Sequence, residues 1–360
     1  MSCLSPMLRV PCGYDRWSLQ NDGVLKEKAL ILKDMPSQRK KLEECNIPYD
    51  VIPCGHCPEC FTKRVKDWSI RLLQESYQHK ENYFVTFTFD DRHLPLNRSL
   101  SKKHVQKLIK RMRNYISNVL ELDCQFKYYA VGEYGEGKGE RMGFNPHYHI
   151  LFFGLNLSNM AGLSEVWPDG HPHTSQSGDK LLYSPMLSEM WPFGTVTVQE
   201  ITYGTVSYVA GYVHKKLFDD VPVIHKEVDF YRGSDGKAFH FIVPVKYEMH
   251  KYAGVAKPFS LMSKGLGKDW LESSIDLVYL TDEIFYHSGA FGALSAKPPR
   301  YYDKLLGRHN EEKANQIKEN RKKLARMKVN VVSDSQFFYN MNVKESQIVH
   351  RRSLRKRNLS

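Results

Sequence analysis

Residues 83–89 have the sequence Tyr-Phe-Val-Thr-Phe-Thr-Phe, and the run ends at Asp90 and Asp91. Aromatic and β-branched side chains favour the extended backbone of a strand, and adjacent aspartates favour the turn that ends it. We therefore predict a strand over residues 83–89. Its position decides the fold, because strand and helix signals alternate on both sides of it.

The segments around this strand predict a mixed architecture. A helix begins at Ser99 or Ser101, and its apolar residues recur at helical spacing. Its apolar face consists of Val105, Leu108, Ile109, Met112, Ile116 and Val119. Further strands are predicted at 127–133, 146–154 and 195–202, and further helices at 62–78 and 205–217. Because most connections are not parallel crossovers, we expect an α+β fold, an antiparallel sheet with helices on one face.

The chain divides into four regions by composition. Residues 1–80 hold six of the seven cysteines and form a Cys-rich N-terminal region. Residues 80–220 carry the strand and helix signals and form the predicted core. Residues 221–302 have a weaker pattern and are an accessory region. Residues 303–360 are predicted to be a basic tail that begins as a polar, charged helix over 303–329.

The composition is that of a water-soluble chain. Its 360 residues suffice for two domains, or for one core with long appendages. Hydrophobic residues make up 41% of the sequence, the mean hydropathy is −0.50, and no stretch approaches the ~18 apolar residues of a membrane span. The first residues lack the pattern of a signal peptide. We therefore expect a cytoplasmic protein without a membrane partner, whose cysteines stay reduced.

The positive charge concentrates towards the C-terminal end. The whole chain has a formal net charge of +12. Residues 311–360 contain 13 Lys and Arg against 5 Asp and Glu, a net charge of +8, and the last cluster is Arg351, Arg352, Arg355, Lys356 and Arg357. Such a cluster binds polyanions by releasing counterions, although a solvated tail has the same composition. The charge favours nucleic acid as a partner over a membrane surface, because the tail has few large apolar residues.

Two histidines on the predicted strand at 146–154 form a candidate metal site. Side chains alternate across a strand, so His147 and His149 point to the same face and can converge on one ion. His171 and His173 have the same spacing but lie in a Pro/Gly/Ser-rich loop, where no strand aligns them. The alternative for the first pair is two histidines that are satisfied by hydrogen bonds at a sheet edge.

A third ligand is needed, and Glu133 is the candidate. It ends the strand before a glycine-rich loop, which folds that strand back beside the histidines. Glu136 and Glu140, within the loop, are rivals, and an ordinary exposed strand end is the alternative interpretation of Glu133. A carboxylate with two imidazoles suits Mg²⁺ or Mn²⁺ in a site left open for phosphate oxygens.

Residues 208–216, with the sequence Tyr-Val-Ala-Gly-Tyr-Val-His-Lys-Lys, carry a candidate nucleophile. On a helix Tyr208 and Tyr212 share a face, and Lys215 and Lys216 follow one turn later. The chain has 21 tyrosines, and this is the only pair four residues apart. The alternative is an aromatic stripe that packs on the sheet. Gly211 costs about 1 kcal/mol relative to alanine inside a helix, which hints at close packing there.

Together these features fit attack by a tyrosine on a phosphodiester. A phenol has a pKa near 10 and is a weak nucleophile at neutral pH. A divalent cation can polarise the phosphate, and a lysine can stabilise the phenolate. Attack leaves a 5′-phosphotyrosine and a free 3′-hydroxyl that primes synthesis. A second tyrosine one helical turn away can attack after a round of copying and release a circle.

These motifs carry a resemblance to a known family. The strand at 84–90, the strand that begins Pro-His-Tyr-His at 146 and the Tyr-x-x-x-Tyr-x-x-Lys-Lys helix occur in the order of the HUH endonuclease superfamily. More closely, the chain resembles the replication initiators of gokushovirus-type Microviridae, small single-stranded DNA phages. Residues 53–60 and 131–135 resemble that family too, so the resemblance covers roughly residues 50–220. The chain departs from it at Gly211, where related phages often carry a basic residue, and in a longer gap between Glu133 and His147.

The resemblance implies both a function and a set of site residues. It implies that His147, His149 and Glu133 bind a divalent metal, that Tyr208 and Tyr212 are nucleophiles, and that Lys215 or Lys216 assists them. The implied activity is nicking of single-stranded DNA at a phage origin, to drive rolling-circle replication in the cytoplasm of a bacterial host. Since the chain lacks a phosphate-binding loop of the Gly-x-x-x-x-Gly-Lys-Ser/Thr type, unwinding is expected from a host helicase, alongside other host replication proteins.

Three cysteines form a second candidate metal site. Cys54, Cys57 and Cys60 have the spacing of metal-binding thiolates, and in a cytosolic protein this spacing favours a structural Zn²⁺ site. The fourth ligand stays open among Cys45, Cys12, Cys3 and His56. The alternatives are an iron–sulfur cluster and reduced cysteines in a turn.

Other protein classes explain less of the sequence. A non-enzymatic, zinc-containing DNA-binding protein accounts for the charge and the cysteines, but not for the histidine strand and the tyrosine helix. A relaxase or transposase of the HUH type shares the chemistry and differs in its partners. Relaxases usually place three histidines in the metal site, and a third is not evident here.

Overall fold

The structure is a computed structural model that describes residues 7–15, 26–55, 57–95, 97–135, 145–160, 162–175, 178–218, 223–231, 238–246, 255–288 and 292–326. Of these, the side chains of residues 11–15, 26–30, 33, 58, 212–218, 223–231, 238–246 and 325–326 stay outside the description. The chain forms two compact units built from interleaved segments. Unit 1 takes its described residues from 7–63, 223–246 and 322–326, and unit 2 takes them from 64–218 and 255–321.

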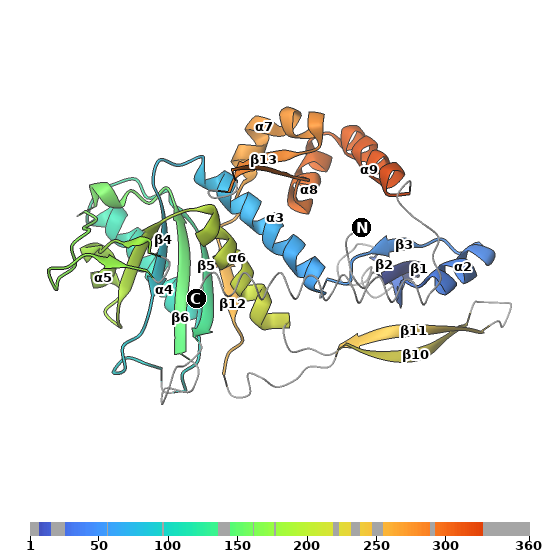
Figure 1. Ribbon diagram of the computed structural model, residues 1–360, viewed down its shortest axis with the longest axis horizontal. Coiled ribbons are helices and arrows are strands. Elements are labelled where there is room, and N and C mark those ends of the chain that lie inside the picture. The colour runs from blue at the N-terminus through green and yellow to red at the C-terminus, as the bar shows by residue number, and fades with distance from the viewer. Residues whose placement is uncertain are drawn as a thin grey trace. The chain divides into compact units, whose positions relative to one another are not determined.

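A five-stranded antiparallel sheet forms the centre of unit 2 (Figure 1). In spatial order its strands are β12 (Phe259–Met262), β5 (Lys127–Gly135), β6 (Asn145–Phe153), β4 (Asn82–Phe87) and β9 (Val196–Glu200). The four strands predicted from the pattern correspond to β4, β5, β6 and β9, which confirms the antiparallel sheet. The edge strand β12 comes from beyond residue 220, where the sequence pattern is weak.

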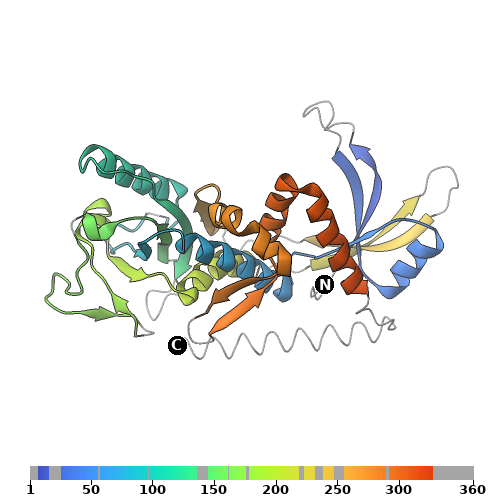
Figure 2. The same cartoon turned by 90° about the horizontal axis from the view of Figure 1, so that it is seen from above.

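Helices cover both faces of this sheet, as Figure 2 shows for α4 on one side and for α3 and α6 on the other. Helices α4 (Lys102–Asn118) and α5 (Pro185–Met190) pack on the face that carries Ile150 and Phe152. Helices α3 (Pro58–Ser76) and α6 (Tyr203–Phe218) pack on the face of Leu151 and Phe153. The expectation of helices on one face was therefore wrong. Consecutive residues of β6 are apolar and buried, so neither face is left to water.

Helix α4 confirms the amphipathic helix predicted from Ser101 onwards. Five of its predicted apolar residues are buried, namely Val105, Leu108, Ile109, Met112 and Ile116. The sixth, Val119, is 61% exposed and lies just beyond the last helical residue. Its assignment to the apolar face was wrong, because the helical periodicity ends one residue before it.

A second core of unit 2 lies against the other side of α3. It contains Ile70 and Leu73 of α3 and buried residues of four later elements. These are α7 (Lys268–Thr281), β13 (Ile284–His287), β14 (Ala293–Ala296) and α8 (Arg300–His309). The single helix predicted over 303–329 is in fact two, α8 and α9 (Glu311–Arg326). Asn310 separates them, since its side-chain oxygen accepts from the backbone N–H of Lys313 at 2.9 Å and caps α9.

Between β6 and β9 the chain forms a short excursion on unit 2. It contains η1 (Leu157–Asn159) and the small hairpin of β7 (His173–Thr174) and β8 (Lys180–Leu181). Further along the chain, the four residues that resemble a shortened phosphate-binding loop, 265–268, form a turn ahead of α7, as the sequence predicted.

Unit 1 contains a three-stranded antiparallel sheet with the order β2-β1-β3. Its elements are β1 (Met7–Asp15), β2 (Lys26–Lys33), α2 (Pro36–Glu44), β3 (Asp50–Ile52) and the hairpin of β10 (Val223–Tyr231) and β11 (Ala238–Lys246). Its small core holds Leu8, Val10, Leu32 and Leu42. The basic cluster at 351–357 lies outside the described residues. Among the helices that are described, none is both long and apolar enough to cross a membrane.

Candidate active site

Strand register brings the predicted metal ligands together on one face of the unit 2 sheet. Glu133 of β5 lies directly opposite His147 of β6, and Thr86 of β4 lies directly opposite His149. Residues paired across antiparallel strands present their side chains on the same face. The four side chains therefore share the face on which α3 and α6 pack.

The three ligand candidates converge on one point. Nε2 of His147 lies 2.6 Å from Oε1 of Glu133, and Nε2 of His149 lies 3.2 Å from the same oxygen. The ligand atoms of all three residues lie within 4.8 Å of one another. Glu133 is only 2% exposed, so the interpretation of an ordinary exposed strand end does not hold.

Both imidazole rings are oriented by partners on their other nitrogen. Nδ1 of His149 lies 2.8 Å from the hydroxyl of Thr86, and Nδ1 of His147 lies 3.1 Å from the backbone carbonyl of Asn145. A ring that donates from Nδ1 keeps its Nε2 lone pair for a metal ion. The ring of Phe84 stacks on that of His149 with centroids 5.3 Å apart. These contacts aim both Nε2 atoms at Glu133.

The carboxylate of Glu133 has the chemistry of a metal ligand. Burial by itself raises the pKa of this carboxyl, but hydrogen bonds from His147 and His149 more than offset it, so the pKa lies below its usual value. The group is therefore a carboxylate at neutral pH. Its second oxygen, Oε2, is buried and has no hydrogen-bond partner among the residues that the structure describes. A buried carboxylate oxygen without a donor fits coordination of a cation.

Helix α6 carries Tyr208 to this group. The helix starts with a reciprocal cap, in which the N–H of Thr205 donates to the hydroxyl of Thr202 and the N–H of Thr202 donates to that of Thr205. Val206, Val209 and Ala210 are fully buried against the sheet. Tyr208 lies at the border of this buried face and is 42% exposed, with its ring centroid 5.4 Å from that of His149.

The remaining predicted residues of the helix are placed only by their backbone. Tyr212, Lys215 and Lys216 belong to α6, which continues to Phe218, but their side chains lie outside the described part of the chain. A side chain at Gly211 would meet only Val65, at 4.0 Å. The close packing that this glycine suggested is therefore absent.

Other candidates lie apart from this group. His171 and His173, which share the spacing of the histidine pair, are exposed on the hairpin excursion, and His173 contacts Asp169 at 2.7 Å. Glu136 and Glu140 lie outside the described residues. Cys54, Cys57 and Cys60 form a separate group in unit 1.

Sequence reasoning missed Thr86, Phe84 and Asn145. Thr86 and Phe84 sit on the very strand that decides the fold, and alternation alone puts them on one face of it. That this face is the face of His149 depends on the pairing of β4 with β6, which no local pattern encodes.

Comparisons with known proteins agree on one family. Residues 82–217 match the sequence model of a family of replication-associated proteins of the ORF2 type. The chain is 29% identical over 284 residues to the replication-associated protein ORF2 of Spiroplasma virus 4, covering 77% of this chain and 75% of the relative. It is 37% identical over 166 residues to the replication-associated protein ORF4 of Chlamydia phage 1, covering 46% and 38%.

A third relative extends the same similarity. The replication-associated protein VP4 of Bdellovibrio phage phiMH2K is 25% identical over 264 residues, which cover 72% of this chain and 69% of the relative. No solved structure matches the chain. The matched segment contains the whole group of Glu133, His147, His149 and Tyr208. Residues 82–217 thus form a domain of the ORF2-type replication-associated protein family, in a chain similar to the replication-associated proteins of microvirus phages.

Proposed function

We propose that this chain is a replication initiator of the HUH endonuclease type, which nicks single-stranded DNA at a phage origin through a tyrosine and starts rolling-circle replication. The observation that carries the proposal is the position of Tyr208, with its ring 5.4 Å from that of His149, beside the group of Glu133, His147 and His149. An aromatic stripe that only packed on the sheet would not leave a phenol 42% exposed at a ligand cluster.

The metal ligands in this proposal are Nε2 of His147, Nε2 of His149 and the carboxylate of Glu133. Mg²⁺ or Mn²⁺ suits this set, and such a cation polarises the scissile phosphate when it is bound. Three protein ligands leave room for phosphate oxygens. Thr86 and Asn145 hold the two imidazole rings in the orientation that the ion requires.

Tyr208 is the proposed first nucleophile. Its phenolic oxygen forms a bond to phosphorus, the bond from phosphorus to the 3′-oxygen breaks, and the phenolic proton ends on the 3′-hydroxyl through solvent. The product is a 5′-phosphotyrosine that keeps the energy of the phosphodiester for religation. Backbone positions 208, 212 and 215 of a helix share a face, because each residue turns it by about 100°. This favours Tyr212 as the second nucleophile and Lys215, rather than Lys216, as the assisting cation.

The proposal is tested with labelled single-stranded DNA that contains the origin of the chain's own replicon. Purified protein is incubated with Mn²⁺ or with EDTA, and the products are separated on a denaturing gel. We expect a covalent adduct that needs the metal, that is lost in Tyr208→Phe and that is lost in His147→Ala with His149→Ala. Tyr212→Phe should keep the first cleavage and lose the second transfer.

Two control variants separate chemistry from folding. Tyr203→Phe removes a hydroxyl from the same helix, where Tyr203 stacks on Tyr286 with centroids 5.5 Å apart, and it should form adduct normally. The pair His171→Ala with His173→Ala removes the same motif from the hairpin and should also be active. Wild-type protein that binds the DNA without ever forming an adduct would falsify the nickase proposal and favour a non-enzymatic DNA-binding protein.

A further inference from the structure

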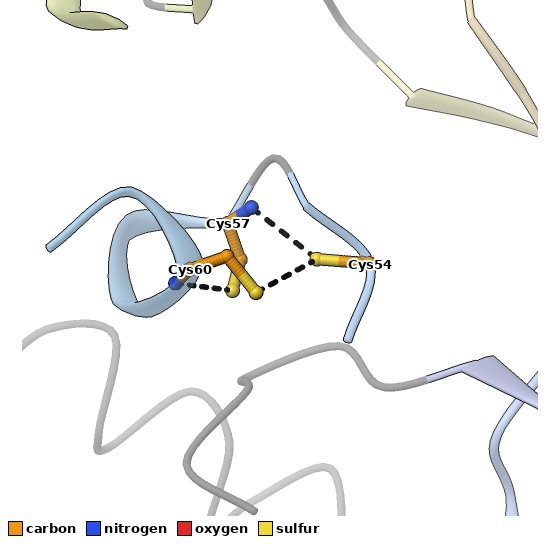
Figure 3. Close-up of side chains that lie close together, drawn as sticks. All are labelled: Cys54, Cys57 and Cys60. Atoms are coloured by element: carbon orange, nitrogen blue, oxygen red, sulfur yellow. Dashed lines mark hydrogen bonds between the residues drawn. The ribbon is translucent and has the colours of Figure 1, made fainter. Parts of the chain in front are cut away.

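The three clustered cysteines of unit 1 lie at the start of α3 and face one another (Figure 3). Cys54 is in the loop before the helix, Cys57 immediately precedes it, and Cys60 is in its first turn. All three are buried, with exposures of 8%, 7% and 9%. Three buried thiols that converge in this way form a ready set of soft ligands.

The spacing of the sulfurs fits one ion. Sγ of Cys54 and Sγ of Cys60 are 3.9 Å apart, and the three sulfurs lie within 4.8 Å of one another. A tetrahedral ion with bonds of about 2.3 Å to sulfur holds its thiolates about 3.8 Å apart. The cysteines of an iron–sulfur cluster bind different irons and therefore stand farther apart than one coordination tetrahedron allows.

Local backbone groups favour the thiolate form that a metal needs. The N–H of Cys57 donates to Sγ of Cys54 at 3.3 Å, and the N–H of Cys60 donates to Sγ of Cys57 at 3.4 Å (Figure 3). The first turn of α3 adds the positive end of the helix dipole. Three negative sulfurs this close would repel one another, so an ion of positive charge is needed to hold them together.

We propose that Cys54, Cys57 and Cys60 bind a single Zn²⁺ ion that orders the loop before α3 and the first turn of that helix. Binding releases the thiol protons and forms three bonds from zinc to sulfur, without any redox step. Because the ion fixes backbone that has little apolar core of its own, its binding energy contributes to folding of this segment. The site is independent of the histidine site of unit 2.

The structure narrows the choice of a fourth ligand. Cys45 is described and is not part of the group. Met7 packs against the three cysteines, and Cys12 is five residues farther along β1, about 16 Å away at the rise of a strand. Register points the same way, because β3 runs towards Met7 and leads to Cys54 beyond it. Cys3 and His56, which lie outside the described residues, remain as the ligands that the chain can supply.

The test is the metal content of the full-length protein, measured by elemental analysis and native mass spectrometry. We expect one zinc per chain, and cobalt in its place should give the absorption of a thiolate-bound tetrahedral ion. Cys54→Ser, Cys57→Ser and Cys60→Ser should each lower zinc affinity roughly 100-fold. The matched variants Cys12→Ser, Cys45→Ser and Cys124→Ser should keep it, as should His147→Ala with His149→Ala.

A second measurement covers variants that fail to fold. Chelation of the wild-type protein should speed amide exchange over residues 50–61, and added Zn²⁺ should restore the protection. Protein that binds iron and sulfide, or that binds no metal, would overturn the proposal. Loss of zinc in Cys12→Ser or Cys45→Ser would overturn the geometric assignment.

Discussion

Gly267 occupies a position that no other residue fits. Its φ is 75°, and an added Cβ would lie 2.5 Å from the hydroxyl of Tyr302 and 2.9 Å from the backbone carbonyl of Arg71. We expect Gly267→Ala to lower the free energy of unfolding by about 2–4 kcal/mol, because backbone strain and a steric clash add. Gly170→Ala is the control, with a φ of 83° and open space around it, and should cost about 1 kcal/mol. Urea denaturation of the two variants should show this difference, and equal losses would contradict the clash.

Thr86 tests whether the hydrogen bond behind His149 matters for metal binding. Thr86→Val keeps the shape of the side chain and the strand preference but removes the hydroxyl that lies 2.8 Å from Nδ1 of His149. We expect Mn²⁺ affinity, measured by titration calorimetry, to fall about 10- to 100-fold while stability changes little. Thr88→Val is the control, because that hydroxyl donates instead to the carbonyl of Thr195. Unchanged affinity in Thr86→Val would remove Thr86 from the site.

Sequence alone predicted the residues of the site better than their supports. The alternation of a strand is local, so the spacing of His147 and His149 is enough to place them on one face. The placement of Glu133 beside them needed only a strand that folds back. The contact of Thr86 with His149 joins residues 63 apart and depends on the register of β4 against β6, which follows from the packing of the whole sheet.

Helices were predicted where their pattern is long and one-sided. The five buried residues of α4 follow a simple period, and the start of α6 was missed by only two residues. Short elements were not found, because the four residues of β12 are too few to show a period. The boundary at Asn310 escaped notice because both flanking helices are polar, although an asparagine followed by two glutamates is a signal for a helix start.

Helix α6 contains a glycine that its packing does not require. A Cβ at Gly211 would meet only Val65 at 4.0 Å, which is ordinary contact. We expect Gly211→Ala to raise the free energy of unfolding by about 0.5–1 kcal/mol, because alanine loses less backbone entropy in a helix. Thermal denaturation measures the change. A stabilised variant that forms less adduct would show that the glycine serves the tyrosine pair, and a destabilised one would contradict the open packing.

Helix α3 is joined to β5 and to the turn before α7 by the buried carboxylate of Glu75, which is 1% exposed. Burial by itself raises the pKa of this carboxyl, but hydrogen bonds from His79, Lys127 and the N–H of Gly267 more than offset it and lower the pKa. A lowered pKa in the folded state means that Glu75 stabilises the fold above the unfolded pKa near 4.5, and that this is lost as pH falls through the folded value.

Replacing this carboxylate should therefore have an effect that depends on pH. We expect Glu75→Gln to lose about 2–4 kcal/mol at pH 7, because Lys127 loses a partner 2.8 Å away, and to approach the wild type below about pH 4. Denaturant unfolding at a series of pH values measures both. Glu272→Gln, on an exposed ion pair with Lys268, should change stability by less than about 1 kcal/mol throughout. A constant difference between Glu75→Gln and the wild type from pH 7 to pH 3 would rule out titration of Glu75 as the cause.

The molecule as a whole separates chemistry from charge. The group of Glu133, His147, His149 and Tyr208 lies in a core whose strands are set by apolar packing on both faces. The largest concentration of positive charge is instead in the last fifty residues of the sequence. A nickase needs both a precise site and affinity for a polyanion, and in this chain different segments supply them. The two contributions should therefore be separable by mutation.

Neutralising the last basic cluster tests that separation. We expect replacement of Arg351, Arg352, Arg355, Lys356 and Arg357 by glutamine to weaken binding of single-stranded DNA and to reduce the slope of log affinity against log salt by up to about 3, because each lost phosphate contact removes about 0.7. A variant with lysine at the four arginine positions keeps the charge and should keep the slope. Fluorescence anisotropy between low and moderate salt gives both slopes, and cleavage of DNA bound at saturation should be equal in all three proteins. An unchanged slope in the glutamine variant would mean that DNA is held by the folded units alone, and slower cleavage at saturation would place the tail near the reacting phosphate.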